Sequence, residues 1–254
     1  MKSPWSFVFA LSLLLACNKT VVFDGANAYA DGFETYASSK TLLDDSDEFW
    51  TFTQLTLEGN TITVDSTFAH TGQQSLRFDG AGTSGDILSK TSLSKSNLAF
   101  WEGESLRVTA WYYLADTLEL AWLFLMDLEE KIPVGAGPGM RIALVDNQLL
   151  LEHKYLEPNL LQPEATAIEF PRNQWVEIQW ELTLSRNGAG EVRLWQDGQL
   201  LIEATEHNTL PKDVLYFQQG TLGRYNSLEI GLTAQPANQP ARLWVDEVKI
   251  ELVE

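Results

Sequence analysis

An alternation of apolar and polar residues with a period of two constrains the fold of this chain more than any other feature. The stretch QWVEIQWELTLS, residues 174–185, places Val176, Ile178 and Trp180 at every second position, and residues 105–115 repeat the pattern. Side chains alternate between the two faces of a strand, whereas a helix repeats every 3.6 residues, so this spacing predicts strands. Because no segment has a convincing helical period, we expect an all-β protein.

Turn residues between these segments predict hairpins. Asp197-Gly198 lies in the middle of residues 190–204 and suits a type I′ turn, and Asp146-Asn147 takes the same place in residues 141–157. Strands of this kind, each with one apolar face, predict two packed antiparallel sheets, a jelly-roll sandwich. Residues 118–128, LELAWLFLMDL, are apolar on both faces, so they form either a central strand covered on both sides or a surface for a protein partner.

The N-terminal residues predict export. Residues 1–16 carry Lys2 and then a short apolar stretch, as a signal peptide does, and Leu14-Leu15-Ala16-Cys17 resembles a bacterial lipobox. The resemblance implies lipidation of Cys17 and attachment to a membrane through acyl chains; the alternative is a plain signal peptide with an incidental cysteine. Asn18 favours the outer membrane of a Gram-negative bacterium. We expect a tether over residues 17–30 and one jelly-roll domain over residues 31–254.

The chain is strongly acidic, with a formal net charge of −18. Nucleic-acid binding needs a basic surface, so we expect no nucleic-acid partner. An acidic surface attracts divalent cations, although solubility alone also explains the charge.

A carboxylate near the C-terminus poses a question of its own. With a strict period of two, Asp246 shares a face with Trp244, Val248 and Ile250. An unpaired buried carboxylate is costly, so Asp246 needs a partner. The partner is a cation such as Arg242 or a metal ion, unless Asp246 lies at a partly wet strand end.

Several stretches in order resemble the jelly-roll domains of carbohydrate-active proteins. DGFETY (31–36), AHTGQQSLRF (69–78) and LWVDEVKIEL (243–252) resemble the opening strand, a turn and the closing strand of carbohydrate-binding modules. GEVRLWQDGQ (190–199) resembles a hairpin of the concanavalin A-like lectin/glucanase superfamily, including heparin-lyase-like domains. The resemblance implies a concanavalin A-like fold. It also implies a structural calcium ion held by Glu34, Asp246 and carbonyl groups around His70 to Gln73.

Polar faces of the expected strands carry aromatic and hydrogen-bonding side chains together. Such a face suits a sugar, because aromatic rings stack on its C–H face and polar groups bind its hydroxyls. We therefore expect a cell-surface protein that binds polysaccharide without catalysis through a concave sheet face. The expected binding residues are Arg107, Trp111, Tyr113, Trp175, Gln179, Arg193 and Trp195.

An enzyme of the same fold, a polysaccharide lyase or a glycoside hydrolase, is the first alternative. No strand carries the closely spaced carboxylates of a glycosidase; Glu177, Gln179 and Glu181 come nearest. A lyase needs a base and an acid, commonly His and Tyr, for which His153 and Tyr155 are weak candidates. YFQQG, beginning at Tyr216, faintly resembles a motif of alginate-lyase-type jelly rolls. A protein-interaction surface is the second alternative.

Overall fold

The structure is a computed structural model, and it describes residues 25–43, 49–82, 88–115, 120–130, 139–154, 158–210, 223–236 and 238–253. Almost all regular structure in these residues is β-strand, with two short 3₁₀ turns at Ser39–Thr41 and Glu164–Thr166. The strands are β1 Ala28–Asp31, β2 Phe52–Leu55, β3 Thr61–Asp65, β4 Ser75–Gly80, β5 Ser89–Lys95, β6 Phe100–Trp101, β7 Ser105–Leu114, β8 Trp122–Glu129, β9 Gly139–Val145, β10 Gln148–His153, β11 Trp175–Thr183, β12 Gly190–Gln196, β13 Gln199–His207, β14 Arg224–Tyr225, β15 Ser227–Gln235 and β16 Ala241–Leu252.

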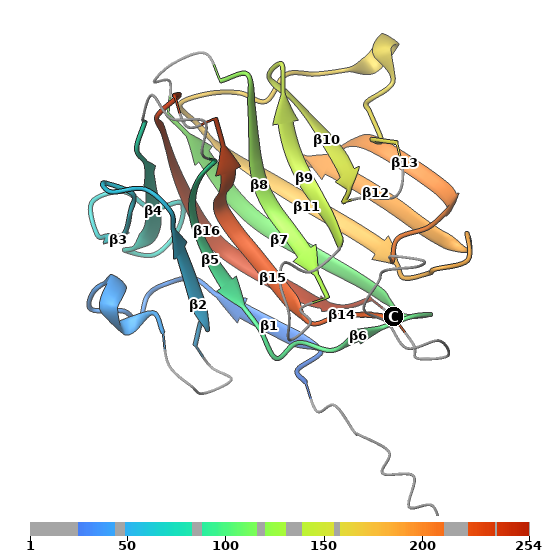
Figure 1. The fold of residues 1–254 in the computed structure, drawn as a ribbon, viewed down its shortest axis with the longest axis horizontal. Helices are drawn as coiled ribbons and strands as arrows, with labels where there is room; N and C mark the ends of the chain where they lie inside the picture. The colour runs from blue at the N-terminus through green and yellow to red at the C-terminus, as the bar shows by residue number, and fades with distance from the viewer. Residues whose placement is uncertain are drawn as a thin grey trace, which may run out of the picture.

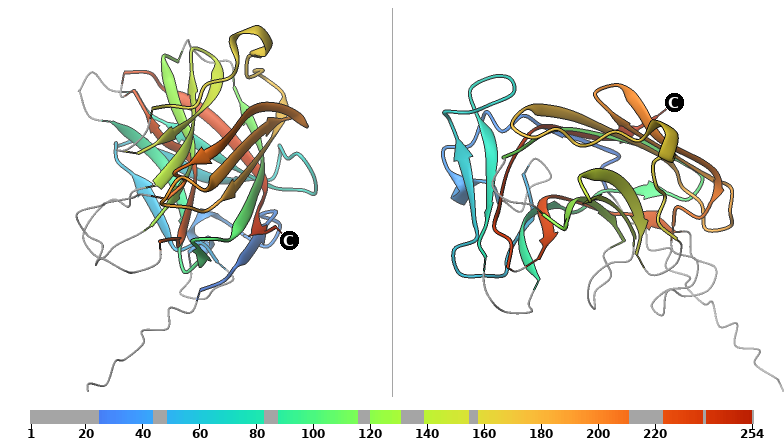
Figure 2. Two further views of the ribbon diagram at one scale, coloured as in Figure 1. Left: turned by 90° about the vertical axis from the view of Figure 1, so that its right-hand side faces the viewer. Right: turned by 90° about the horizontal axis from the view of Figure 1, so that it is seen from above.

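Two antiparallel sheets pack face to face, which confirms the predicted sandwich (Figure 1). One sheet has eight strands in the order β13-β12-β11-β7-β16-β4-β3, with β1 also paired to β16. The other has six, in the order β10-β9-β8-β15-β5-β2. Figure 2 (right) shows the eight-stranded sheet bowed around the six-stranded one, so the outer face of the former is convex and the outer face of the latter is concave.

The core lies between the sheets and follows the predicted alternation. Val108, Ala110 and Tyr112 of β7 are fully buried, as are Ile178 and Trp180 of β11. Burial of these apolar side chains is the main favourable contribution to folding, at about 25 cal/mol per Å² of apolar surface. The period-two pattern therefore fixes which face of each strand looks inward.

The segment that is apolar on both faces is a central strand. β8 lies between β9 and β15 in the six-stranded sheet. Leu123, Leu125 and Leu128 are fully buried and Asp127 is 3% exposed, while Trp122 and Phe124 at the start of the strand are half-buried. The apolar character of this segment therefore reflects its central place in the sheet, and it no longer argues for a surface for a protein partner.

A β-bulge in the closing strand corrects the predicted face of Asp246. The pairing of β16 with β7 shifts between Asp246 and Lys249, and Glu247 has a positive φ of 48°. An extra residue reverses the alternation of the strand. Val248 faces the core, whereas Asp246 lies on the outer side of the eight-stranded sheet, where it is still fully buried.

Residues 1–24 lie outside the described residues, so the signal peptide and the lipidation of Cys17 stay predictions. Residues 28–30, which we expected in the tether, belong to β1 and pair with Lys249, Ile250 and Glu251 of β16. None of the helices in the described part of the chain has the length and hydropathy needed to cross a membrane.

Candidate functional site

One row of residues crosses the concave face of the six-stranded sheet from edge to edge. Backbone register places these residues directly opposite one another on neighbouring strands, and directly opposed side chains share a face. We call this set the concave row: Phe52 of β2, Ser94 of β5, Glu229 of β15, Asp127 of β8, Arg141 of β9 and Glu152 of β10. With strands about 4.8 Å apart, it spans about 24 Å.

A second, shorter row lies beside the concave row. Ser227 of β15 is opposite Glu129 of β8, which is opposite Gly139 of β9. Lys154, just past β10, donates its backbone N–H to the Gly139 carbonyl at 2.8 Å. Gly139 is required here because a Cβ at this position would lie 1.8 Å from the Leu128 carbonyl oxygen. The missing side chain lets the chain approach β8 closely.

The two rows are joined by a buried network of ion pairs. Lys154 Nζ lies 2.6 Å from Asp127 Oδ1 and also binds Glu129 Oε1. Arg141 Nε lies 3.2 Å from the same Asp127 oxygen, and its guanidinium carbon lies 4.2 Å from the centroid of the Phe124 ring. Two cations and two carboxylates thus balance each other, as buried charges must.

Among the described residues no cation forms an ion pair with Glu229, whose carboxylate accepts a hydrogen bond from the Ser92 hydroxyl. Burial, together with the negative charges of Asp127 and Glu129, raises the pKa of Glu229 to about 7. Burial also raises the pKa of Asp127, but Lys154 and Arg141 outweigh it and hold that pKa below its usual value. Glu229 therefore exchanges a proton near neutral pH while its neighbour stays ionised.

Lys154 is a permanent cation in this network. Burial alone lowers the pKa of its ammonium group, but Asp127 and Glu129 more than offset this, and the pKa lies above its usual value. Lys154 is therefore charged at neutral pH, and the carboxyl group of the network that titrates there is Glu229. The arrangement offers fixed positive charge beside one carboxyl group that titrates near pH 7.

The residues expected to bind sugar lie on the opposite side of the molecule. β7, β11 and β12 are neighbours, as expected, and Arg107, Trp111, Tyr113, Trp175, Gln179, Arg193 and Trp195 share one face. That face is the outer face of the eight-stranded sheet, and it is convex where we expected a concave groove (Figure 2). The curvature of the two sheets depends on tertiary packing, so it cannot be predicted from the period-two pattern of single strands.

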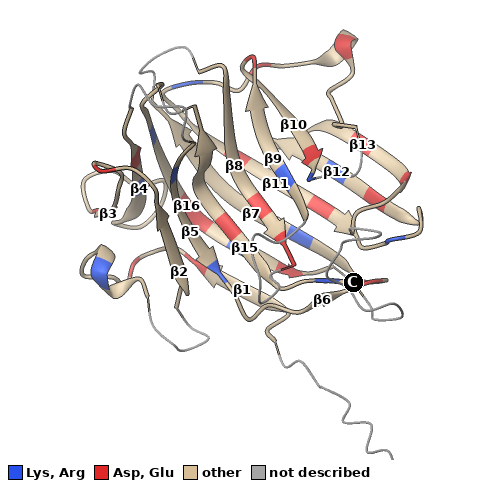
Figure 3. Cartoon of the chain, in the orientation of Figure 1, with Lys and Arg blue, Asp and Glu red and all other residues tan. Residues whose placement is uncertain are grey.

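The arginines of this convex face are already neutralised. Register aligns an alternating ladder across five strands: Glu251, Arg107, Glu181, Arg193 and Glu203. Arg107 Nη2 lies 2.6 Å from Glu181, and Arg193 Nε lies 2.9 Å from Glu203. Figure 3 shows acidic and basic residues interspersed over the sheets rather than gathered by sign. This ladder offers no surplus positive charge to a polyanion.

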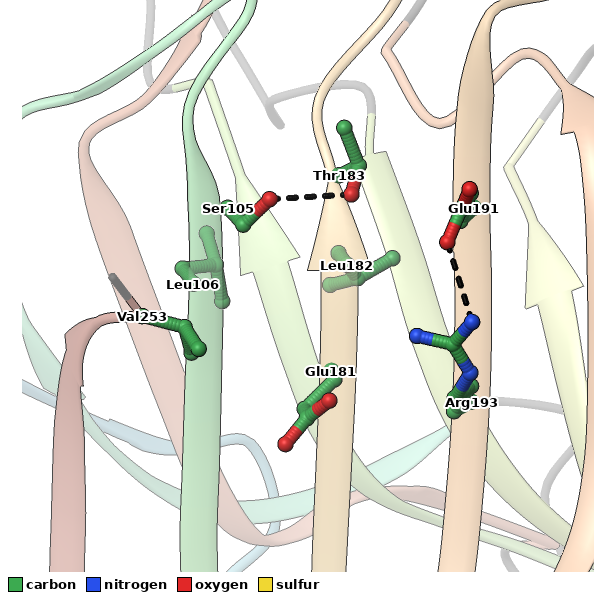
Figure 4. Close-up of a pocket in the computed structure, with 8 residues that line it drawn as sticks. All are labelled: Ser105, Leu106, Glu181, Leu182, Thr183, Glu191, Arg193 and Val253. Atoms are coloured by element: carbon green, nitrogen blue, oxygen red, sulfur yellow. Dashed lines mark hydrogen bonds and ion pairs between the residues drawn. The ribbon is translucent and has the colours of Figure 1, made fainter.

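A small pocket of about 200 Å³ adjoins the ladder (Figure 4). Hydroxyl groups of Ser105 and Thr183 lie 2.9 Å apart on one side, and Arg193 bonds to Glu191 at 3.1 Å on the other. These polar groups satisfy one another.

The loop before β4 packs on part of the aromatic cluster of the convex face, whose rings stay half-buried. The Phe68 ring stacks on Trp175 at 5.5 Å and contacts Tyr113 and Trp244 edge-on or tilted, while the His70 ring stacks on Trp111 at 3.7 Å. The cluster therefore anchors a loop of the protein itself.

The same loop supplies the partners of Asp246. Its carboxylate accepts hydrogen bonds from the backbone N–H groups of His70 at 2.9 Å, Thr71 at 3.3 Å and Glu247 at 2.8 Å. Glu34 likewise accepts the N–H groups of Gln73 and Gln74. Arg242 binds Asp79 instead, so it is not the partner of Asp246.

Glu34 and Asp246 bind one loop between them, through its N–H groups rather than through the carbonyl groups that the resemblance implied. Among the described residues, however, no three His, Cys, Asp or Glu side chains are grouped to hold a metal ion, and both carboxylates are directed at N–H donors. Calcium here stays a prediction, which melting with and without a chelator would test.

Of the candidate catalytic residues, only His153 lies among the described residues. His153 is 3% exposed and sits opposite Met140, on the core side of β10 with Leu149 and Leu151, away from the concave row. Tyr155 and Tyr216 lie outside the described residues. The sequence interpretation missed Asp127, Arg141 and Glu229, which are isolated charges on strands that are otherwise largely apolar; β8 carries Glu129 as well as Asp127.

A family model described as polysaccharide lyase matches residues 43–249, and the chain belongs to that family. No curated protein matches the chain. Three solved structures share the fold. An endo-β-1,4-glucuronan lyase from the fungus Trichoderma reesei is 14% identical, covering 80% of this chain and 91% of that one, with a TM-score of 0.64. The cellulose-induced protein Cip1 is 16% identical (87% and 95% covered, TM-score 0.62), and the alginate lyase Aly36B is 8% identical (89% and 97%, TM-score 0.55).

The family corrects the expected function. We expected a non-catalytic binding protein, but a chain of which residues 43–249 match a polysaccharide lyase family is assigned to a family of enzymes. The lyase alternative was the better interpretation. The sequence interpretation sought a catalytic pair within single strands, so residues brought together from several strands lay outside its reach.

Proposed function

We propose that this protein is a polysaccharide lyase that cleaves a uronate-containing polysaccharide by β-elimination at the concave row. The family match carries this proposal. The titrating Glu229 lies opposite Asp127, to which the Arg141 and Lys154 cations are ion-paired, and this supports the location, since elimination needs both a proton carrier and positive charge.

Elimination requires three things of the site. The uronate carboxylate must be stabilised so that the hydrogen on the adjacent carbon becomes acidic, that proton must be removed, and the departing glycosidic oxygen must receive a proton. Arg141 and Lys154 supply positive charge for the first task. Glu229 as a carboxylate takes the proton and, once protonated, returns it to the leaving oxygen. The C–O bond breaks, a C=C bond forms in the sugar ring, and no co-reactant is consumed.

The pKa of Glu229 suits this double role. A carboxyl group with a pKa of about 7 is partly ionised at neutral pH, so it is a stronger base than an ordinary glutamate and still a competent acid.

Glucuronan and alginate are the first substrates to test, since structures with this fold include lyases named for each. The purified protein is incubated with each polymer, and the ultraviolet absorbance of unsaturated chain ends is followed. Cleavage by the wild type and its loss in Glu229→Gln support the proposal. Undiminished cleavage by Glu229→Gln, with Glu203→Gln on the convex face as the matched control, overturns the assignment of the site.

A further inference from the structure

Phe52 marks one end of the concave row. Phe52 is the aromatic residue of the concave row and lies on the edge strand β2. It is 49% exposed to solvent. The middle of the row is buried by contrast, since Ser94 is only 2% exposed and Glu229 only 3% exposed. An exposed apolar side chain is ordinary in isolation. Its alignment with the proposed catalytic carboxyl group is what distinguishes this one.

Register gives the spacing between Phe52 and Glu229. Phe52 lies opposite Ser94, and Ser94 lies opposite Glu229, so two strand spacings of about 4.8 Å separate the two backbones. The resulting distance of about 10 Å leaves room for a neighbouring sugar residue of a chain that runs across the strands. A polymer cleaved at Glu229 would then extend over the edge of the sheet at β2.

Polar groups lie beside the exposed ring. Gln54 follows Phe52 on the same face of β2, opposite Ser92, and its side-chain oxygen is buried with no hydrogen-bond partner among the described residues. That oxygen faces inward, but Gln54 as a whole is half-buried and its terminal torsion is broad, so a turn of the amide would bring the unsatisfied oxygen to a hydroxyl group arriving from solvent. An apolar ring next to an available hydrogen-bond acceptor is the combination that binds the C–H face and the hydroxyl rim of a sugar.

We propose that Phe52 and Gln54 form a distal sugar-binding subsite, which stacks a pyranose residue of the polysaccharide away from the bond that is cleaved. This inference rests on the proposed function. The subsite recognises the apolar face and the hydroxyl groups of the sugar rather than a carboxylate. It makes the enzyme favour substrates long enough to reach from Glu229 to β2.

The chain provides a matched control for this subsite. Leu55 lies on the same strand and is also 49% exposed. Its side chain belongs to the other face of β2, however, and its backbone pairs with Thr91, outside the concave row. Phe52→Ala and Leu55→Ala remove similar exposed apolar surface at the same sheet edge. A general effect on β2 would therefore appear in both variants, whereas an effect on the subsite appears in one.

The test measures kcat/KM for oligosaccharides of increasing length, prepared from the polysaccharide that the wild type cleaves. Phe52→Ala should lower kcat/KM by about 3- to 10-fold on long oligosaccharides, mainly through KM, as expected for loss of one aromatic contact. The loss should disappear on the shortest substrates. Phe52→Trp should restore the length preference, and Leu55→Ala should match the wild type. Equal length dependence in Phe52→Ala and the wild type overturns the inference.

A binding measurement separates this inference from the proposed function. Retardation of each variant in native gels that contain the polysaccharide reports affinity without catalysis. If the wild type cleaves nothing, the proposed function fails, yet weaker retardation of Phe52→Ala than of Leu55→Ala still supports the subsite. If the wild type is active and both variants are retarded equally, the subsite fails and the proposed function stands.

Discussion

Glu229 of β15 and Asp127 of β8 occupy directly opposed positions in the six-stranded sheet, yet their surroundings move their pKa values in opposite directions. Lys154 and Arg141 both contact Asp127 and hold it ionised. Glu229 is buried beside those negative charges and accepts a hydrogen bond from Ser92. Neighbouring carboxyl groups with separated pKa values are a hallmark of acid–base sites.

The activity of the enzyme should depend on the ionisation of Glu229. We expect Glu229→Gln to lower kcat by about 10²- to 10⁴-fold, the usual contribution of a general acid or base. In the wild type, kcat/KM should rise as the pH passes about 7, where Glu229 becomes able to accept a proton. Rate profiles from pH 5 to 9 measure both effects, and the same rise in the residual activity of Glu229→Gln would contradict the assignment.

Stability should fall as the pH rises toward neutrality. The pKa of Glu229 is raised from 4.5 to about 7 on folding, so between these values the folded state holds a proton that the unfolded state has lost. The free energy of unfolding therefore decreases with pH across this window and levels off above it. Glu130, whose pKa burial also raises to about 7, contributes in the same direction.

Urea unfolding at several pH values measures this decline. Glu229→Gln should flatten part of it, and Glu229→Gln combined with Glu130→Gln should flatten more. A slope between pH 5 and 7 that is identical in the wild type and the double variant would show that neither carboxyl group is buried as described.

Lys154 should be important for folding as well as for the site. Lys154→Met leaves Asp127 without its nearest cation and Glu129 without its ion-pair partner. Removing one member of a buried ion pair typically costs about 3–5 kcal/mol, so we expect a loss of that order in the free energy of unfolding. Adding Asp127→Asn and Glu129→Gln should recover part of the loss, and a failure of the triple variant to recover any would argue against the network.

Asp246 should stabilise the loop that covers the convex face. Asp246→Ala leaves three backbone N–H groups without their acceptor, and each unsatisfied buried donor costs about 1–3 kcal/mol. We expect a lower melting temperature and faster hydrogen exchange at His70 and Thr71. Asp246→Asn keeps an acceptor oxygen and should be milder. A variant as stable as the wild type would mean that the loop is held by its aromatic contacts alone.

Much of the fold could be predicted because the information is local. The alternation in residues 105–115 and 174–185 identifies β7 and β11 and the inward face of each. The face of Asp246 could not be predicted, since one bulged residue at Glu247 reverses the alternation and nothing in the surrounding pattern signals it.

The candidate site was harder to predict from the sequence, for a different reason. Asp127, Arg141 and Glu229 lie on three largely apolar strands with few charges. They share one row only because β15, from late in the chain, enters the sheet between β5 and β8. Strand order is set by tertiary packing. The sequence did contain one signal for these residues. Each is a charged residue flanked by apolar residues within a strand, as in MDL around Asp127 and LEI around Glu229.

The structure of the product tests the central claim most directly. Mass spectrometry of the oligosaccharides released from a uronate polymer separates elimination from hydrolysis, because elimination leaves an unsaturated end that is lighter by one water. We predict unsaturated products from the wild type and almost none from Glu229→Gln. Saturated products from the wild type, or unsaturated products at an equal rate from Glu229→Gln, would contradict the account.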